Sequence, residues 1–175
     1  MRSSWKPSVT VAAVIERDGR YLIIEEHTPD GLRLNQPAGH LDPGESLVQA
    51  VVRETMEETA HDFTPTALVG IYLARFRPTG ATEDITYLRV TFMGEPGRDH
   101  GLALDDGIVR VLWLSYEELA ACRARHRSEL VLQCVDDYRR GQRAPLSVLV
   151  TQASVLHSGA DVDADVNADA DDRRR

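Results

Sequence analysis

The sequence predicts an α/β fold in which a partly antiparallel β-sheet is covered by helices on both faces. The predicted elements follow the order β-hairpin, loop, helix, antiparallel-type strands and two further helices, a mixture typical of such layered domains. The composition, with 42% hydrophobic and 27% charged residues, is that of a globular protein. A chain of 175 residues is the size of one ordinary domain.

The first expected element is a β-hairpin over residues 9–26. Its two β-rich runs flank Asp18-Gly19, a dipeptide that favours the type I′ turn of short hairpins. Residues 27–45 are dense in Gly, Pro and Asp and are expected to form a loop. A helix should begin at Ser46, because Ser46 and Gln49 have the spacing of a capping box.

Three further β-rich runs follow this helix, and two more helices come after them. The predicted strands cover residues 66–76, 85–95 and 111–114. Ser115 and Glu118 have the spacing of a second capping box. Ser128 is expected to cap a longer amphipathic helix that ends near Gly141, a residue suited to the position after a helix end.

Charge and composition argue against several classes of function. The formal net charge of −8 disfavours a surface that binds duplex nucleic acid, which would need a basic stripe. No uncharged run approaches the length of a membrane span, and residues 1–9 lack the apolar segment of a secretory signal. We therefore expect a cytoplasmic protein, monomeric or homodimeric, whose Cys122 and Cys134 are reduced core residues.

The chain is expected to hold one domain, residues 1–155, and an acidic tail, residues 156–175. The apolar pattern stops near Leu156, and Ala and Val alternate with acidic residues beyond it. Such a composition cannot bury enough apolar surface to fold, so the tail should be disordered.

Three carboxylates are crowded into residues 53–60, the segment RETMEETA. On a helical wheel Glu54, Glu57 and Glu58 fall within roughly 100° of one another, and Arg53 points about 100° away from Glu54. A separate arc should face the core and holds Val48, Val52, Thr55, Met56 and Thr59. Like charges at this spacing repel, and a hard divalent cation would offset them. The alternative is a solvated, glutamate-rich helix face.

The spacing of residues over a longer stretch, from Gly39 to Glu58, decides between a cation site and a solvated helix face. Six residues follow the spacing G-x5-E-x7-R-E-x-x-E-E, namely Gly39, Glu45, Arg53, Glu54, Glu57 and Glu58. A chance match in such a chain has a probability on the order of 10⁻⁵. The segment resembles the signature sequence of the Nudix hydrolases, and the resemblance extends from about Pro7 to Val148. Within that family, the chain is most similar to the phosphatase NudJ group through the stretches NQPAGHLDPGESL, KPSVTVAAVI and YRRGQRAPLSVL.

The resemblance implies an α/β/α sandwich with a mixed sheet, in which a loop–helix–loop segment holds Mg²⁺, or Mn²⁺, against a pyrophosphate group. By the family pattern the metal-binding carboxylates are Glu54, Glu57 and Glu58, and the carbonyl oxygen of Gly39 could add another ligand. Glu54 is the first choice for the general base, since Arg53 beside it could orient its carboxylate. Family members differ in where this base lies.

Other residues are candidates for contact with a substrate. Strand alternation puts Tyr87 and Arg89 on one sheet face, where Arg89 could clamp a phosphate, and the alternative is an exposed sheet-face arginine. His40 adjoins Gly39, and Glu45 is expected to pair with Arg53 and tie the loop to the helix. Further aromatic and carboxylate candidates are Tyr72, Phe76, Asp105 and Asp106.

Two positions depart from the usual family pattern. Thr55 stands where an aliphatic residue is commoner, which should affect packing rather than chemistry. Ala60 replaces the usual Gly at the helix end, where left-handed geometry costs a residue with a side chain roughly 1 kcal/mol. The loop after the helix is therefore expected to leave the helix differently from the loop in family members that have Gly at this position.

The function that follows is Mg²⁺-dependent hydrolysis of phosphoanhydride bonds in small pyrophosphorylated substrates. Similarity to the NudJ group implies nucleoside tri- and diphosphates, together with hydroxymethylpyrimidine pyrophosphate, and release of orthophosphate. One alternative substrate is ADP-ribose or another nucleoside diphosphate sugar. A non-enzymatic nucleotide-sensing module is the alternative from another class, but such modules typically lose the carboxylates that this chain keeps.

Overall fold

The computed structural model describes residues 5–77 and 82–156. Within them the strands are β1 (Ser8–Arg17), β2 (Arg20–Thr28), β3 (Gly31–Asn35), β4 (Ala38–His40), β5 (His61–Phe76), β6 (Ile85–Asp99), β7 (Ile108–Ser115) and β8 (Ala144–Pro145). They form one sheet in the order β3-β2-β1-β6-β5-β8, and β4 pairs with β1 while β7 pairs with β2. The β1–β6 pair is parallel and the β1–β2 and β5–β6 pairs are antiparallel, so the predicted mixed sheet is confirmed.

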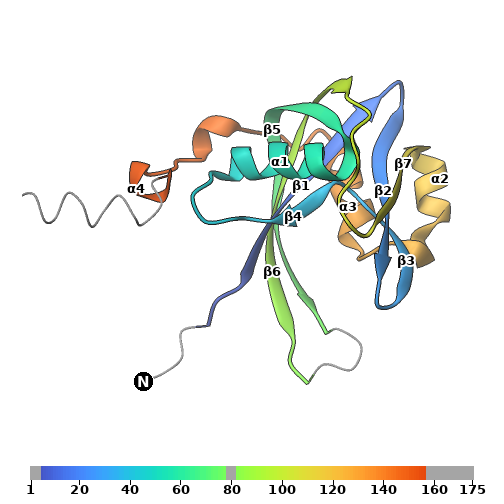
Figure 1. Ribbon diagram of the computed structural model, residues 1–175, viewed down its shortest axis with the longest axis horizontal. Helices are drawn as coiled ribbons and strands as arrows, with labels where there is room; N and C mark the ends of the chain where they lie inside the picture. Colours follow the sequence, from blue (N-terminus) through green and yellow to red (C-terminus); the bar gives the residue numbers. More distant parts are fainter. Residues whose placement is uncertain (1–4, 78–81, 157–175) are drawn as a thin grey trace, which may run out of the picture.

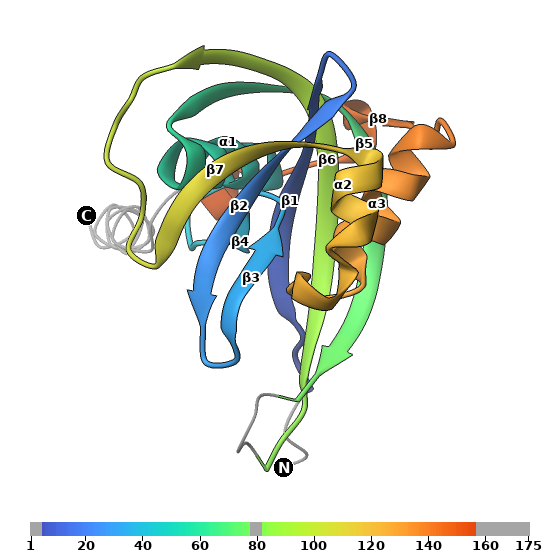
Figure 2. The same ribbon diagram turned by 90° about the vertical axis from the view of Figure 1, so that its right-hand side faces the viewer.

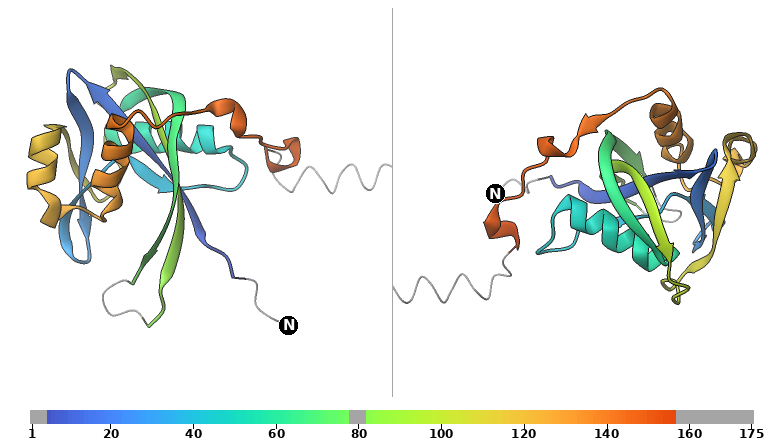
Figure 3. Two further views of the ribbon diagram at one scale, coloured as in Figure 1. Left: turned by 180° about the vertical axis from the view of Figure 1, so that it is seen from behind. Right: turned by 90° about the horizontal axis from the view of Figure 1, so that it is seen from above.

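Helices cover both faces of this sheet, as predicted. They are α1 (Leu47–Thr59), α2 (Tyr116–Ala121), α3 (Leu130–Arg139) and the short α4 (Ala153–Leu156), with 3-10 turns at Arg123–Arg125 and Leu146–Val148. Helix α1 lies on one side of the strands and α3 on the other (Figures 1 and 3), and α2 stands beside α3 (Figure 2). No helix in the described part of the chain is long and apolar enough to cross a membrane.

Strand alternation divides the core into two clusters. On β1, Val11, Ala13 and Ile15 are buried in the cluster that includes α1, while Val14 is buried in the cluster that includes α3. Both faces of β1 are therefore apolar, which explains its nearly continuous run of hydrophobic residues. The second cluster holds the buried Cys134, and Cys122 is half-buried; both thiols are free.

Local turn chemistry accounts for several element boundaries. Asp18 and Gly19 have φ of 52° and 76°, the left-handed pair that a type I′ turn needs, so the predicted hairpin is confirmed. Both predicted capping boxes form, at Ser46 and at Ser115. Gly141, with φ of 81°, follows the end of α3 as predicted.

Two local predictions were wrong. The segment 27–45 is not one loop, because β3 and β4 lie within it; β3 pairs with β2 and β4 with β1. Strands this short carry little periodic pattern, and their pairing comes from the rest of the sheet. Ser128 does not cap α3, whose N-cap is Glu129 with no capping side-chain hydrogen bond. Of the predicted tail, Leu156 ends α4 and residues 157–175 lie outside the described residues.

Helix α1 is rotated relative to the arc predicted for its core face. Thr55 and Thr59 are buried as expected, but Val48, Val52 and Met56 are only partly buried. The fully buried side chains of the helix include Ala50 and Val51, and the two glutamates Glu54 and Glu58 lie on the same side. The glutamates thus belong to the buried stripe of α1 rather than to a solvated face.

The end of α1 keeps a left-handed residue although it is not glycine. Ala60 has φ of 57° and its amide donates to the carbonyl of Met56. Strand β5 begins at the very next residue, His61. The chain therefore leaves the helix without a loop.

A buried carboxylate on β2 links three segments and makes the fold sensitive to acid. Glu25 is 2% exposed and accepts hydrogen bonds from Arg110 Nε at 2.7 Å and from Arg125. The hydrogen bond from Arg110 is the main cause that lowers the pKa of Glu25 from 4.5. A lowered pKa contributes stability above the ordinary value, and this contribution is lost as the pH falls through the lowered one.

We expect Glu25→Gln to lower the free energy of unfolding by about 2 kcal/mol at pH 7, because a charge-assisted pair of hydrogen bonds is weakened. The difference from wild type should shrink below pH 4.5 as the wild-type carboxylate becomes protonated. Urea unfolding between pH 3 and pH 8 measures it. Glu129→Gln, at an exposed position, is the control, and a constant difference over this range would contradict the prediction.

Candidate active site

A cleft of about 460 Å³ opens between α1, β4 and the far end of the β5–β6 pair. This end, residues 71–76 paired with residues 85–90, is here called the β5–β6 arm; it extends beyond the rest of the sheet in Figure 1. The predicted residues that line the cleft are Gly39, His40, Glu54, Glu58, Tyr87 and Arg89. Residues far apart in the chain are thus brought to one site.

Close packing between β4 and α1 brings Glu54 against Gly39. Gly39 pairs with Val11 of β1, which holds β4 over the helix. A β-carbon added at Gly39 would lie 2.1 Å from the carboxyl carbon of Glu54, so only glycine allows this approach. The need for glycine at this position is therefore steric.

Glu58 and Glu54 are carboxylates held out of water. Each residue is 9% exposed, and Glu58 Oε2 accepts a hydrogen bond of 2.7 Å from the amide of Ala38. Burial raises the pKa of Glu58 to about 8, and the charge of Glu54 adds to this effect. Burial likewise raises the pKa of Glu54, against the opposing hydrogen bond from Arg53. Two carboxyl groups with raised pKa values in one cleft are a common feature of functional sites.

Arg53 joins the loop, the helix and β4. Its Nε and Nη2 donate to the two carboxylate oxygens of Glu45 at 3.0 and 2.7 Å, which confirms the predicted pair. Nη1 donates to Glu54 Oε1 at 2.8 Å and to Glu57 Oε2 at 2.9 Å. Nη2 also donates to the carbonyl of His40 at 3.0 Å.

These contacts correct the wheel-based expectation that Arg53 points away from Glu54. The long side chain bends along the helix surface, so its guanidinium reaches Glu54 and Glu57 together. Glu57 is held in this network with its side chain 39% exposed, and it does not line the cleft. Glu45 does not line the cleft either. Within residues 5–77 and 82–156, no three His, Cys, Asp or Glu residues are grouped as a preformed metal site.

Arg89 of β6 faces Glu54 and Glu58 across the cleft. It is only 7% exposed, so the alternative of an exposed sheet-face arginine was wrong. Its Nη2 donates to Asn35 Oδ1 at 3.3 Å and Gln36 Oε1 at 3.2 Å, while its Nε has no hydrogen-bond partner among the described residues. Burial lowers the pKa of Arg89. A buried guanidinium with a spare donor is suited to an anionic ligand.

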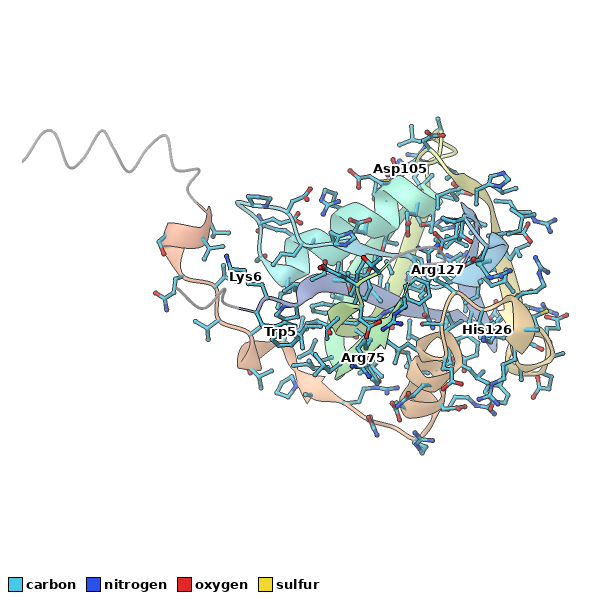
Figure 4. The ribbon with its side chains drawn as sticks, turned by 90° about the horizontal axis from the view of Figure 1, so that it is seen from below. Trp5, Lys6, Arg75, Asp105, His126 and Arg127 are labelled. Carbon is cyan, nitrogen blue, oxygen red and sulfur yellow. The ribbon has the colours of Figure 1, made fainter. Side chains whose placement is uncertain are left out.

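The remaining candidates are divided between the cleft and other parts of the fold. Tyr87 and His40 lie with ring centroids 6.2 Å apart at its edge, where Phe76 also lines it. Tyr72 lies opposite Arg89 in the β5–β6 pair but does not line the cleft, and its hydroxyl donates to Asp137 of α3 at 2.9 Å. The amide of Asp105 donates to the carbonyl of Glu57 at 3.0 Å, which places its loop beside α1 (Figure 4).

Several cleft residues had no signal in the sequence. Glu26, Asn35 and Arg127 come from β2, from the end of β3 and from the segment before α3. They follow no common spacing, because they meet only through strand pairing and the attachment of residue 127 to β3. The alternation of β2, which separates Glu25 from Glu26, was the one available hint.

Comparison with known proteins identifies the family of this chain. Residues 5–134 match the model of the NUDIX domain. The chain belongs to the Nudix hydrolase family. Among Nudix proteins, it is 35% identical over 150 residues to the Phosphatase NudJ of Escherichia coli K12, an alignment that covers 83% of this chain and 92% of that protein.

Solved Nudix structures share the fold. A Nudix hydrolase from Nitrosomonas europaea superposes with a TM-score of 0.78 at 51% identity, over 84% of this chain and 98% of that one. A MutT Nudix hydrolase from Burkholderia pseudomallei superposes with a TM-score of 0.60 at 19% identity, over 76% of this chain and 98% of that one. The second likeness concerns the fold alone.

Proposed function

We propose that this Nudix protein hydrolyses phosphoanhydride bonds in small pyrophosphorylated substrates, with Mg²⁺ or Mn²⁺ as its cofactor. The observation that carries the proposal is the placement of two buried carboxylates, Glu54 and Glu58, opposite the buried Arg89 in one cleft. The similarity to Phosphatase NudJ supports a phosphatase activity. Nucleoside tri- and diphosphates, with hydroxymethylpyrimidine pyrophosphate as a further candidate, are the substrates that the sequence resemblance implies.

The residues at the cleft fit a hard divalent cation. Carboxylate and carbonyl oxygens are the ligands that Mg²⁺ and Mn²⁺ prefer, and Glu54, Glu58 and the carbonyl of Gly39 supply them. Glu57 would join them after release from Arg53, to which it is bonded at 2.9 Å. Burial is the main cause of the raised pKa values of Glu54 and Glu58, and a bound cation would stabilise the charged form of both carboxylates.

Each remaining group has a defined task in the proposed reaction. Bound at these carboxylates, the cation would draw charge from the phosphoryl oxygens and acidify the attacking water. Arg89 would hold a non-bridging phosphate oxygen through its free Nε. Glu54, oriented by Arg53, would accept the proton of the water as its oxygen bonds to phosphorus and the anhydride oxygen leaves.

The substrate side of the cleft is formed by His40 and Tyr87. Their rings are tilted by 53° and line the cleft, where a substrate group beyond the phosphates would lie. An aromatic edge of this kind can stack on a base. A nucleoside diphosphate sugar such as ADP-ribose is the alternative substrate, and its products distinguish it.

A panel of nucleoside di- and triphosphates, hydroxymethylpyrimidine pyrophosphate and ADP-ribose, assayed with Mg²⁺, tests the proposal. We expect Mg²⁺-dependent release of orthophosphate from the first three classes and complete loss of turnover in excess chelator, because the carboxylates alone repel the phosphates. Nucleoside monophosphate plus sugar phosphate as the main products would favour the alternative. Metal-independent turnover, or none with any substrate, would contradict the proposal.

A further inference from the structure

Glu26 of β2 is a cleft carboxylate that the proposed chemistry does not use. Strand β2 pairs in regular register with β3, Glu25 opposite Leu34 and Glu26 opposite Arg33, so the two glutamates point to opposite faces of the sheet. Glu25 turns to Arg110 and Arg125, whereas Glu26 lines the cleft together with Glu58 and Arg89. The neighbouring glutamates therefore serve different purposes.

One oxygen of Glu26 has no hydrogen bond. Its Oε1 is buried and lacks any partner among the described residues. The other oxygen, Oε2, lies 3.6 Å from Arg127 Nη1, which makes an ion pair beyond hydrogen-bond length. A buried acceptor without a partner costs free energy, and in a ligand cleft it indicates that the ligand carries the matching donor.

Arg127 places donors beside this acceptor. Its backbone amide donates to the carbonyl of Leu34 at 2.8 Å, which fixes the segment before α3 to β3. The side chain, 42% exposed, lies on the cleft side of the molecule that Figure 4 shows from below. An acceptor and a donor next to each other match a heterocycle edge that carries an amino group beside an unprotonated ring nitrogen.

We propose that Glu26 and Arg127 recognise this amino edge of the substrate base, as found in adenine and cytosine. Glu26 Oε1 accepts from the exocyclic amino group, and the Arg127 guanidinium donates to the adjacent ring nitrogen. Hypoxanthine and uracil present a carbonyl and a ring N–H instead, which would set acceptor against acceptor and donor against donor. The inference rests on the proposed hydrolase function and adds a preference among its substrates.

The test compares matched pairs of substrates, ADP with IDP and CDP with UDP. Wild type should show kcat/KM about thirtyfold higher for the amino member of each pair, since a keto analogue leaves the acceptor of Glu26 unpaired. In Glu26→Gln the amide can donate to a keto oxygen, so the ratio should fall to about one or reverse. Arg127→Met should lower kcat/KM for ADP about tenfold and reduce the same ratio.

Glu117→Gln, at an exposed position of α2, is the matched control and should keep the wild-type ratio. Thermal unfolding of each variant shows whether the fold is retained, and Glu26→Asp, which keeps the carboxylate, should retain a preference for the amino members.

Equal wild-type rates on both members, or an unchanged ratio in Glu26→Gln, would overturn the inference while leaving the hydrolase function intact. An equal loss on both members with a raised Mg²⁺ requirement would overturn it too, because Glu26 would then act on the cation. Absence of any Mg²⁺-dependent turnover in wild type would refute the hydrolase function itself.

Discussion

Replacement of Glu58 by Gln is expected to reduce kcat/KM for Mg²⁺-dependent phosphate release by roughly 10³-fold, because a neutral amide oxygen lacks the negative charge that holds the cation. The amide oxygen can still accept the hydrogen bond from Ala38, so the local backbone should be kept. The same loss is expected for Glu57→Gln, since the proposed metal site includes that carboxylate. Phosphate release at several Mg²⁺ concentrations measures both effects. Wild-type turnover in either variant would contradict the metal assignment of that residue.

Metal-free stability separates a loss of function from a loss of fold. A group whose pKa is raised in the folded state contributes stability below its ordinary pKa and loses it as the pH rises through the raised value. For Glu58 that interval extends from 4.5 to about 8. Metal-free Glu58→Gln, which cannot ionise, should therefore unfold at the same or a higher temperature than wild type at pH 8. A large destabilisation at this pH would point to a structural cause for the lost activity.

Arg53→Lys is expected to lower kcat by roughly 10²-fold and the free energy of unfolding by about 2 kcal/mol. The guanidinium contacts Glu45, Glu54 and Glu57 and the carbonyl of His40 at once, and an ammonium group cannot reproduce this geometry. Glu54 would lose the contact that orients its carboxylate. Steady-state kinetics and urea unfolding measure the two effects.

Arg20→Lys is the matched control for this substitution. Arg20 also bonds a glutamate, Glu118, at 2.8 Å, but both side chains are 50% exposed. Surface ion pairs contribute little, so the control should change the free energy of unfolding by less than about 1 kcal/mol and leave kcat unchanged. Equal effects of Arg53→Lys and Arg20→Lys would mean that the Arg53 network has no special role.

Local patterns in the sequence were enough for most of the secondary structure. The hairpin turn at Asp18-Gly19 and the start of α1 at Ser46 follow from the turn and capping preferences of single residues, whereas the left-handed Ala60 at the end of α1 goes against the preference of its residue type. The cap of α3 shows the limit of such arguments. Ser128 has the right chemistry, but its segment is held by β3 through residue 127, and the helix begins one residue later than a Ser128 cap would place it.

The candidate site was partly predictable for the same reason. The spacing from Gly39 to Glu58 identified the carboxylate side, because all of its residues lie on one helix and on the short strand and loop before it. The opposite side could not be found in this way. Whether Arg89 is buried or exposed depends on which face of β6 the rest of the fold covers. Strand alternation alone leaves both possibilities open.

By itself, the sequence determined the family, the longer strands and helices and the residues on the glutamate side of the cleft, since each rests on patterns within short stretches of chain. Only the tertiary structure decided that α1 turns Glu54 and Glu58 inward, and that Arg53 holds Glu57 outside the cleft. It alone brought Glu26 and Arg127, about 100 residues apart in sequence, to within 3.6 Å. Such pairings depend on strand register and on the packing of a distant segment, and no local pattern encodes them.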